Sequence, residues 1–219
     1  MTQNNNSRYS KNVRSFPPFA TARVKEEAEK LMQLKGKTKG SELITFANYI
    51  RELKGEEGLN SVEEKMEELG HPFHFNEVKE TGQWYPESIN VLVILVAKHL
   101  FNWSKEDVFN FGYNSPKYSF LSKIFIKYFM SFRMVFEGAP RYWRKFVDVG
   151  ELEATEFNEE KKYLVLQLRH YLFHPVMCDY FAGFFLKIAE NSVKSENVGI
   201  KETKCPYRRD SYHEYVVSW

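Results

Sequence analysis

Two cysteines, a histidine and a glutamate near the end of the chain are residue types that bind metal ions. Cys178 lies in "HPVMCDYFAG", one helical turn after His174, while Cys205 and His213 are separated by seven residues and Glu202 stands three before Cys205. Thiolate and imidazole are donors that zinc prefers, and three protein ligands can be completed by a fourth or by water. The spacing alone leaves three readings open: a metal site, a disulfide, or cysteines buried as small core residues.

The elements that carry these residues decide whether the donors can meet. "ENVGIKETKC" and "YHEYVVSW" predict two strands, and a hairpin would bring Cys205 and His213 together across its loop. "HPVMCDYFAGFFLKIAENS" predicts a helix with Cys178 in its first turn. Because this helix must cover the sheet, we expect the three donors to converge, with Glu202 or His174 nearby.

The wider pattern predicts an α+β fold, with N-terminal helices packed on a mostly antiparallel sheet and a C-terminal β-β-α-β-β unit. Apolar residues recur at helical spacing through the first half, whereas "GELEATEF" and "KKYLVLQLRHY" alternate with period two around turn residues. We divide the chain into a flexible Asn/Ser-rich tail over residues 1–20 and a single α+β ligand-binding or sensor-like domain over 21–219.

Composition narrows the classes of partner. The net charge is +2 with acidic and basic residues interleaved, so the chain shows no concentrated basic face for nucleic acid. The longest apolar run, "INVLVILVA", is far shorter than the roughly 18 residues of a spanning helix. A polar N-terminus without a signal-peptide pattern predicts a cytoplasmic protein whose thiols stay reduced, which argues against a disulfide.

Aromatic residues are abundant, with 19 Phe, 13 Tyr and 4 Trp. Most aromatics simply pack in cores, but they also line pockets for apolar ligands. The segment 117–136 is apolar around most of its circumference, which predicts a helix buried on several sides. We expect an elongated apolar pocket between this helix and the sheet, where a hydrophobic small molecule would contact Phe125, Phe129, Phe132 and Trp143.

Four motifs carry a resemblance to known proteins: "WYP" at 84–86, "GAPRYWRKFVDVGELE" at 138–153, "HPVMCDYFAG" at 174–183 and the ending "TKC…YHEYVVSW". Their order and distances resemble a bacterial protein family of about this length, over residues from about 40 to 219. Its C-terminal half is similar to the 4-vinyl reductase sensor domain. That domain is grouped with haem–nitric oxide sensor domains and vesicle-tethering subunits of Golgi transport, and it is similar to the effector-binding domain of phenol- and xylene-responsive transcription activators.

The resemblance implies a zinc site. In the effector-binding relatives the matching positions hold zinc: Glu202 matches the acidic position, Cys205 the first cysteine of the tail and Cys178 the cysteine at the helix start. His213 falls where a second cysteine is usual, and histidine remains a competent zinc ligand. The turn glycine of those relatives is missing here, where the loop reads "PYRRDS".

The same resemblance argues against haem. The haem sensors of this superfamily use a histidine on a long helix together with a Tyr-x-Ser-x-Arg motif. This chain has "YNSPK" at 113–117, with lysine in the last place, and His99 is the nearest histidine before it. We therefore expect zinc and regard haem as unlikely.

Three classes of function remain. The predicted pocket and the resemblance favour a domain that binds or senses a hydrophobic small molecule and signals through a partner or a homodimer. A structural or protein-interaction module is the alternative. The sequence has no Gly-rich phosphate loop, no GxSxG elbow and no HExxH motif, so an enzyme would need zinc with an open coordination position and is the least favoured class.

Overall fold

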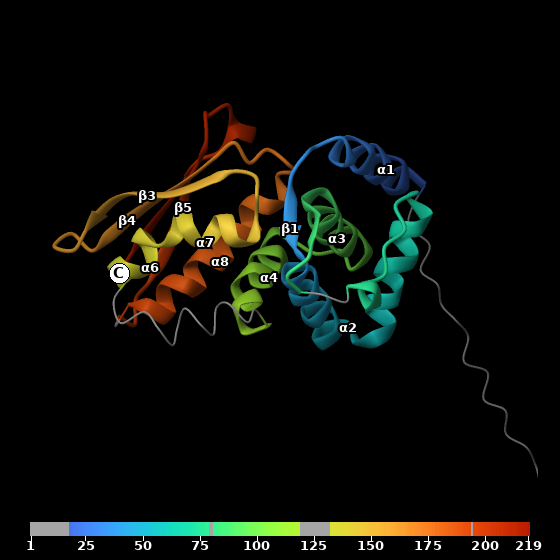
Figure 1. Cartoon of the computed structure of the whole chain (residues 1–219), viewed down its shortest axis with the longest axis horizontal. Coiled ribbons are helices and arrows are strands. Elements are labelled where there is room, and N and C mark those ends of the chain that lie inside the picture. Colours follow the sequence, from blue (N-terminus) through green and yellow to red (C-terminus); the bar gives the residue numbers. More distant parts are fainter. Residues whose placement is uncertain (1–17, 79–80, 119–131, 194) are drawn as a thin grey trace, which may run out of the picture.

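The chain folds into a helical N-terminal part and a C-terminal part built on an antiparallel sheet, as Figure 1 shows. The computed structural model describes residues 18–78, 81–118, 132–193 and 195–219. The arrangement confirms the predicted α+β fold, including the β-β-α-β-β order at the C-terminus. Most of the tail expected over residues 1–20 lies outside the described residues, and the first helix begins at Pro18.

Among the described residues, the N-terminal part consists of four α-helices, a short 3₁₀ helix and a two-stranded ribbon whose strands lie between helices in the sequence. Its elements are α1 (Pro18–Met32), β1 (Lys37–Lys39), α2 (Gly40–Glu68), the short 3₁₀ helix Phe75–Glu77, β2 (Trp84–Pro86), α3 (Glu87–Leu100) and α4 (Lys105–Tyr118). Gly55 interrupts α2 with a φ of 69°, where the sequence predicts a helix end. Ser104 and Asp107 cap each other reciprocally at the start of α4.

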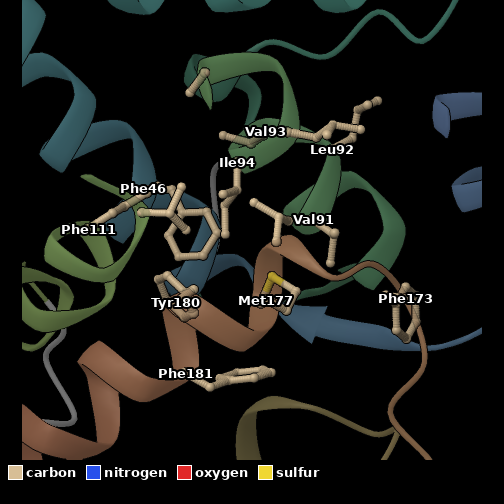
Figure 2. Close-up of a cluster of buried hydrophobic side chains, with 14 of the residues drawn as sticks. Phe46, Val91, Leu92, Val93, Ile94, Phe111, Phe173, Met177, Tyr180 and Phe181 are labelled. Atoms are coloured by element: carbon tan, nitrogen blue, oxygen red, sulfur yellow. The ribbon is translucent and has the colours of Figure 1, made fainter. Parts of the chain in front are cut away.

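The apolar run "INVLVILVA" forms the middle of α3, and every residue from 89 to 97 is buried. A helix that is apolar on all sides has to be covered on all sides, which makes α3 the central helix of this part. Figure 2 shows Val91 and Ile94 of α3 close to Met177 and Tyr180 of the later helix α8 (Val176–Ser192). No helix among the described residues has the length and apolar character needed to cross a membrane.

The C-terminal sheet has the strand order β3-β4-β6-β5, and all its pairs are antiparallel. Its strands are β3 (Glu151–Asn158), β4 (Tyr163–Arg169), β5 (Gly199–Lys204) and β6 (His213–Ser218). Leu164, Leu166 and Leu168 of β4 and alternate residues of β6 are buried. Leu168 pairs with His213 and Leu166 pairs with Tyr215. His213 therefore lies on the inner face of the sheet, against which α8 and the short helices α6 (Phe132–Glu137) and α7 (Ala139–Phe146) pack (Figure 1).

Two glycines allow α4 of the helical part and α8 of the C-terminal part to pack closely against each other. A Cβ atom at Gly112 of α4 would overlap the carbonyl oxygen of Tyr180, and one at Gly183 of α8 would overlap the carbonyl oxygen of Phe109. Each helix thus presents a glycine to the backbone of the other. Only residues without a side chain allow two helices to approach this closely.

A buried carboxyl group lies at the start of α3. Glu87 is 1% exposed and accepts hydrogen bonds from the Tyr171 hydroxyl at 2.5 Å and from the Asn90 side-chain amide at 3.3 Å. Burial raises its pKa to about 7, although both hydrogen bonds favour the charged form. The buried side-chain oxygen of Asn90 has no hydrogen-bond partner among the described residues.

Glu87→Gln should stabilise the protein at alkaline pH. The folded pKa of Glu87 lies above its ordinary 4.5. The protonated carboxyl therefore stabilises the folded state fully below about pH 4.5, and this stability is lost as the pH rises through about 7. The difference between the two pKa values corresponds to a loss of roughly 3 kcal/mol at about pH 8.5. Glutamine keeps an acceptor for Tyr171, and its amide can donate to the unpartnered oxygen of Asn90. Urea unfolding at pH 5 and pH 8.5 measures the effect, and an equal change at both pH values would contradict it.

Candidate metal centre

Four potential metal ligands meet between the start of α8 and the β5–β6 hairpin. The Cys178 sulfur lies 3.5 Å from the Cys205 sulfur and 3.8 Å from Nδ1 of His213, which is 3.2 Å from a Glu202 carboxylate oxygen. One donor atom from each residue lies within 4.8 Å of all the others. A tetrahedral ion about 2.3 Å from each of two sulfurs holds them roughly 3.8 Å apart, so the cluster has the size of a zinc site.

The structure thus brings together the four residues that the sequence suggested as ligands. Cys178 occupies the first turn of α8, Glu202 lies on β5, Cys205 follows that strand and His213 begins β6. Both cysteines are free thiols. The separation of their sulfurs exceeds the roughly 2.05 Å of a disulfide bond, so the described cysteines are not bonded to each other.

The loop between Cys205 and His213 closes without the glycine expected from the resemblance. Arg209 takes the left-handed conformation there, with a φ of 75°. The Cys205 amide donates to the Asp210 carboxylate at 2.8 Å, and its carbonyl accepts from the Arg208 amide at 2.8 Å. These bonds hold the cysteine in place before any metal is present. The sequence analysis did not single out Asp210. The signal for it was its type, because aspartates in turns often accept hydrogen bonds from nearby backbone amides.

His213 is oriented by a hydrogen bond on the far side of its ring. Its Nε2 lies 3.1 Å from the carbonyl oxygen of Tyr171. Because a carbonyl only accepts, Nε2 carries the hydrogen and donates it. Nδ1, on the other side of the ring, faces Cys178 and Glu202. In a metal-bound His213 this nitrogen would give its lone pair to the ion while Nε2–H kept its outer partner, as metal-binding histidines do. The sequence contains no spacing signal for this role of Tyr171.

The thiols and the carboxylate of the cluster favour a bound positive charge. Burial, together with the nearby Glu202 and Cys205, raises the pKa of the Cys178 thiol. Burial would also raise the pKa of Glu202, but its hydrogen bond to His213 and the charge of Arg208 lower it overall. The Arg208 guanidinium lies 3.1 Å from the other Glu202 oxygen. A bound divalent ion would reverse the thiol's preference, because it stabilises the thiolate directly.

His174, the alternative fourth ligand, lies in a different cluster. Its Nε2 is 3.8 Å from a Glu27 carboxylate oxygen, and Nε2 of His99 is 3.9 Å from the same oxygen. The Val176 amide donates to Nδ1 of His174, which fixes the neutral ring with its hydrogen on Nε2. Glu202 therefore takes the fourth place beside the cysteines, and His174 instead connects the start of α8 with α1 and α3.

Acidification should weaken this second cluster. Burial lowers the pKa of both His174 and His99, and although Glu27 opposes that shift, Lys98 and Arg23 add to it. The unfolded state then binds protons more readily, so the stability contributed by these histidines is present above about pH 6.5 and is lost as pH falls below it. Urea unfolding between pH 8 and 5 should show a smaller loss for His174→Gln than for the wild type. The same change at the exposed His170 is the control, and identical pH profiles for His174→Gln and wild type would refute the prediction.

The residues expected to line an apolar pocket are described only in part. Phe125 and Phe129 lie outside the described residues, and so does the side chain of Phe132, which begins α6. Trp143 of α7 packs edge-on against Tyr171 and Phe181, and its indole N–H donates to a backbone carbonyl at 2.9 Å. The apolar pocket therefore stays a prediction.

A different hollow lies between α6 and β3. It is lined by Arg133, Glu137, Ala154, Thr155, Glu156, Phe157 and Leu164. Three of these seven side chains are charged, which suits a polar occupant better than a hydrophobic small molecule.

Comparison with solved structures identifies the fold as that of the H-NOX proteins. An H-NOX protein from S. oneidensis in the Fe(II)NO ligation state covers 82% of this chain and 98% of its own, with 12% identity and a TM-score of 0.63. An oxygen-binding H-NOX domain related to soluble guanylate cyclases covers 82% and 94%, with 13% identity and a TM-score of 0.57. A third, from work on haem distortion in the H-NOX family, covers 83% and 94%, with 14% identity and a TM-score of 0.57. Neither protein-family models nor curated proteins matched the chain.

This likeness corrects the expectation that haem is unlikely. The solved structures that share the fold are H-NOX proteins, and the work on one of them concerns haem, so the fold points towards the cofactor that the sequence motifs argued against. The expectation was wrong because it relied on one short motif and one nearby histidine, whereas the backbone is alike over more than four-fifths of the chain at 12% identity.

The three residues of that motif have partners within the protein. The Tyr113 hydroxyl donates to Glu190 at 2.5 Å, the Ser115 hydroxyl donates to the Phe111 carbonyl, and Lys117 pairs with Glu52 at 2.8 Å. All three side chains are thus engaged within the protein. Absorption spectroscopy tests for haem directly.

Proposed function

We propose that this chain is a sensory domain that binds a small molecule, and that zinc held by its metal centre fixes the C-terminal unit. The observation that carries the metal is the convergence of Cys178, Cys205, His213 and Glu202, three of them buried. Two thiolates, an imidazole and a carboxylate fill a tetrahedron, and a site closed by four protein ligands supports a structural rather than a catalytic ion. The ion would tie the start of α8 to the last hairpin.

The sensory part of the proposal is supported by the H-NOX fold together with the resemblance to the 4-vinyl reductase sensor domain. In this proposal a ligand would stabilise one packing of the helical part on the C-terminal unit, and a partner or a second copy of the chain would respond to the shifted population. A cytoplasmic setting would keep both thiols reduced and available to the metal.

Native mass spectrometry of the purified protein tests the metal first. We expect the wild type to bind one zinc ion per chain after incubation with zinc and to lose it after treatment with a chelator. The variant Cys178→Ser should bind no zinc. Cobalt replacement adds a geometric test, because a tetrahedral site with thiolates gives intense visible absorption. Arg208→Gln is the matched control, since it removes a neighbour of Glu202 without removing a donor. Failure of the wild type to retain zinc under these conditions would refute the metal centre.

Absorption spectroscopy during a titration with hemin tests the second cofactor. A Soret band that shifts and saturates at one haem per chain would add haem to the proposed function. The zinc content measured on the same sample would show whether the two cofactors occupy one protein molecule together. Apolar compounds that the purified protein retains can be extracted with organic solvent and identified by mass spectrometry, which tests for a hydrophobic ligand of any structure.

A further inference from the structure

The segment 170–175, which we call the connector, joins the metal centre to the helical part. It runs from the end of β4 to the start of α8 and begins with His170 at a φ of 57°. Three of its side chains reach the N-terminal part: Tyr171 bonds to Glu87 of α3, the Phe173 ring lies beside Gly36, and His174 faces Glu27 of α1. The connector is therefore one of the places where polar contacts hold the two parts of the protein together.

Tyr171 contacts both the metal centre and the helical part. Its carbonyl accepts from Nε2 of His213 at 3.1 Å, and its hydroxyl donates to Glu87 at 2.5 Å. The residue is 1% exposed, and its ring packs against those of Phe173, Phe181 and Trp143 at centroid distances between 5.0 and 5.9 Å. A ring packed this tightly transmits a displacement of its backbone to its hydroxyl, because close-packed interiors do not absorb such shifts.

We propose that Tyr171 couples zinc at the metal centre to the first turn of α3, so that the metal tightens the helical part on the C-terminal unit. The inference rests on the proposed zinc site and adds a regulatory consequence to it. When Nδ1 of His213 binds a cation, its Nε2–H becomes a stronger donor and holds the Tyr171 carbonyl more firmly. The Tyr171 hydroxyl is then held against Glu87, the first residue of α3 in the helical part.

The coupling is reciprocal, because two linked equilibria must affect each other equally. If zinc strengthens the contact between Tyr171 and Glu87, then removing that contact weakens zinc binding. Glu87 itself is not among the metal ligands, so a change there alters zinc affinity only through what lies between. Zinc affinity therefore reports on the coupling whichever molecule the domain senses.

Zinc affinity should be measured by competition with a chromophoric chelator for five variants and the wild type. We expect Tyr171→Phe and Glu87→Leu each to weaken zinc binding about fivefold or more, the lower range of allosteric couplings. The double variant should lose no more than either single one, because both changes break the same contact. Glu87→Gln, which keeps the acceptor, should leave the affinity unchanged. In the wild type, zinc should also shift the amide resonances of residues 87–90, and in Tyr171→Phe it should not.

Tyr113→Phe is the matched control, because it removes a tyrosine–glutamate bond of the same 2.5 Å length that joins α4 to the last turn of α8. The double variant replaces both partners with apolar groups, which is often nearly neutral for stability, so it remains informative if Glu87→Leu alone does not fold. Zinc bound equally well by wild type, Tyr171→Phe and the double variant would overturn the coupling and leave the metal centre intact. No zinc in the wild type would instead refute the metal centre itself.

Discussion

Cys205→Ala should abolish zinc binding and cost the protein about 4 kcal/mol of stability when free zinc is about a thousand times its dissociation constant. The loss follows from linkage, since a ligand that binds only the folded state stabilises it by RT times the logarithm of one plus the ratio of its free concentration to its dissociation constant. For a chain of this size, that corresponds to a fall in melting temperature of roughly 8 to 16 °C. Cys205 is 2% exposed, so the substitution also removes a small packed side chain.

A comparison with and without zinc separates these two contributions. The difference between wild type and variant in the presence of a chelator gives the packing cost, and the additional difference with zinc gives the metal's share. The chelator should lower the melting temperature of the wild type and leave that of Cys205→Ala unchanged. A chelator effect of equal size on both proteins would show that the metal acts elsewhere.

Gly183→Ala should also destabilise the protein strongly, for a reason unrelated to the metal. The added methyl group would overlap the Phe109 carbonyl oxygen, and because the obstacle is backbone, α4 and α8 must separate. Overpacking typically costs about 1 to 3 kcal/mol, and a backbone obstacle places this site at or above the upper end. Gly112→Ala should behave alike, since it faces the Tyr180 carbonyl across the same contact.

Gly82→Ala is the matched control, because open space surrounds the position where its Cβ would lie. Urea unfolding should give a loss below about 1 kcal/mol there and a several-fold greater loss at Gly183. Equal losses at the two positions would show that α4 and α8 tolerate a wider separation. The outcome also bears on sensing, because the proposed shift between helical part and sheet has to pass through or around this rigid contact.

The sequence by itself determined the elements and the candidate ligands. Alternation along β3, β4 and β6 encodes which face of each strand is buried, and the apolar run of α3 encodes a helix covered on all sides. The meeting of Cys205 and His213 was predictable because a hairpin places its inner ends opposite each other, whatever its register. Cys178 followed because an apolar helix has to cover the sheet.

Only the tertiary structure decided how distant segments pair. The partner of Tyr171 is Glu87, 84 residues earlier, and the Glu27 carboxylate lies beside a histidine from each of two other segments. The close approach of α4 and α8 at Gly112 and Gly183 and the outer partner of His213 were equally invisible in the sequence. The physical reason is that periodicity reports only whether a side chain is buried. Which buried side chain it meets depends on how whole helices and strands pack, and that is a property of the assembled core.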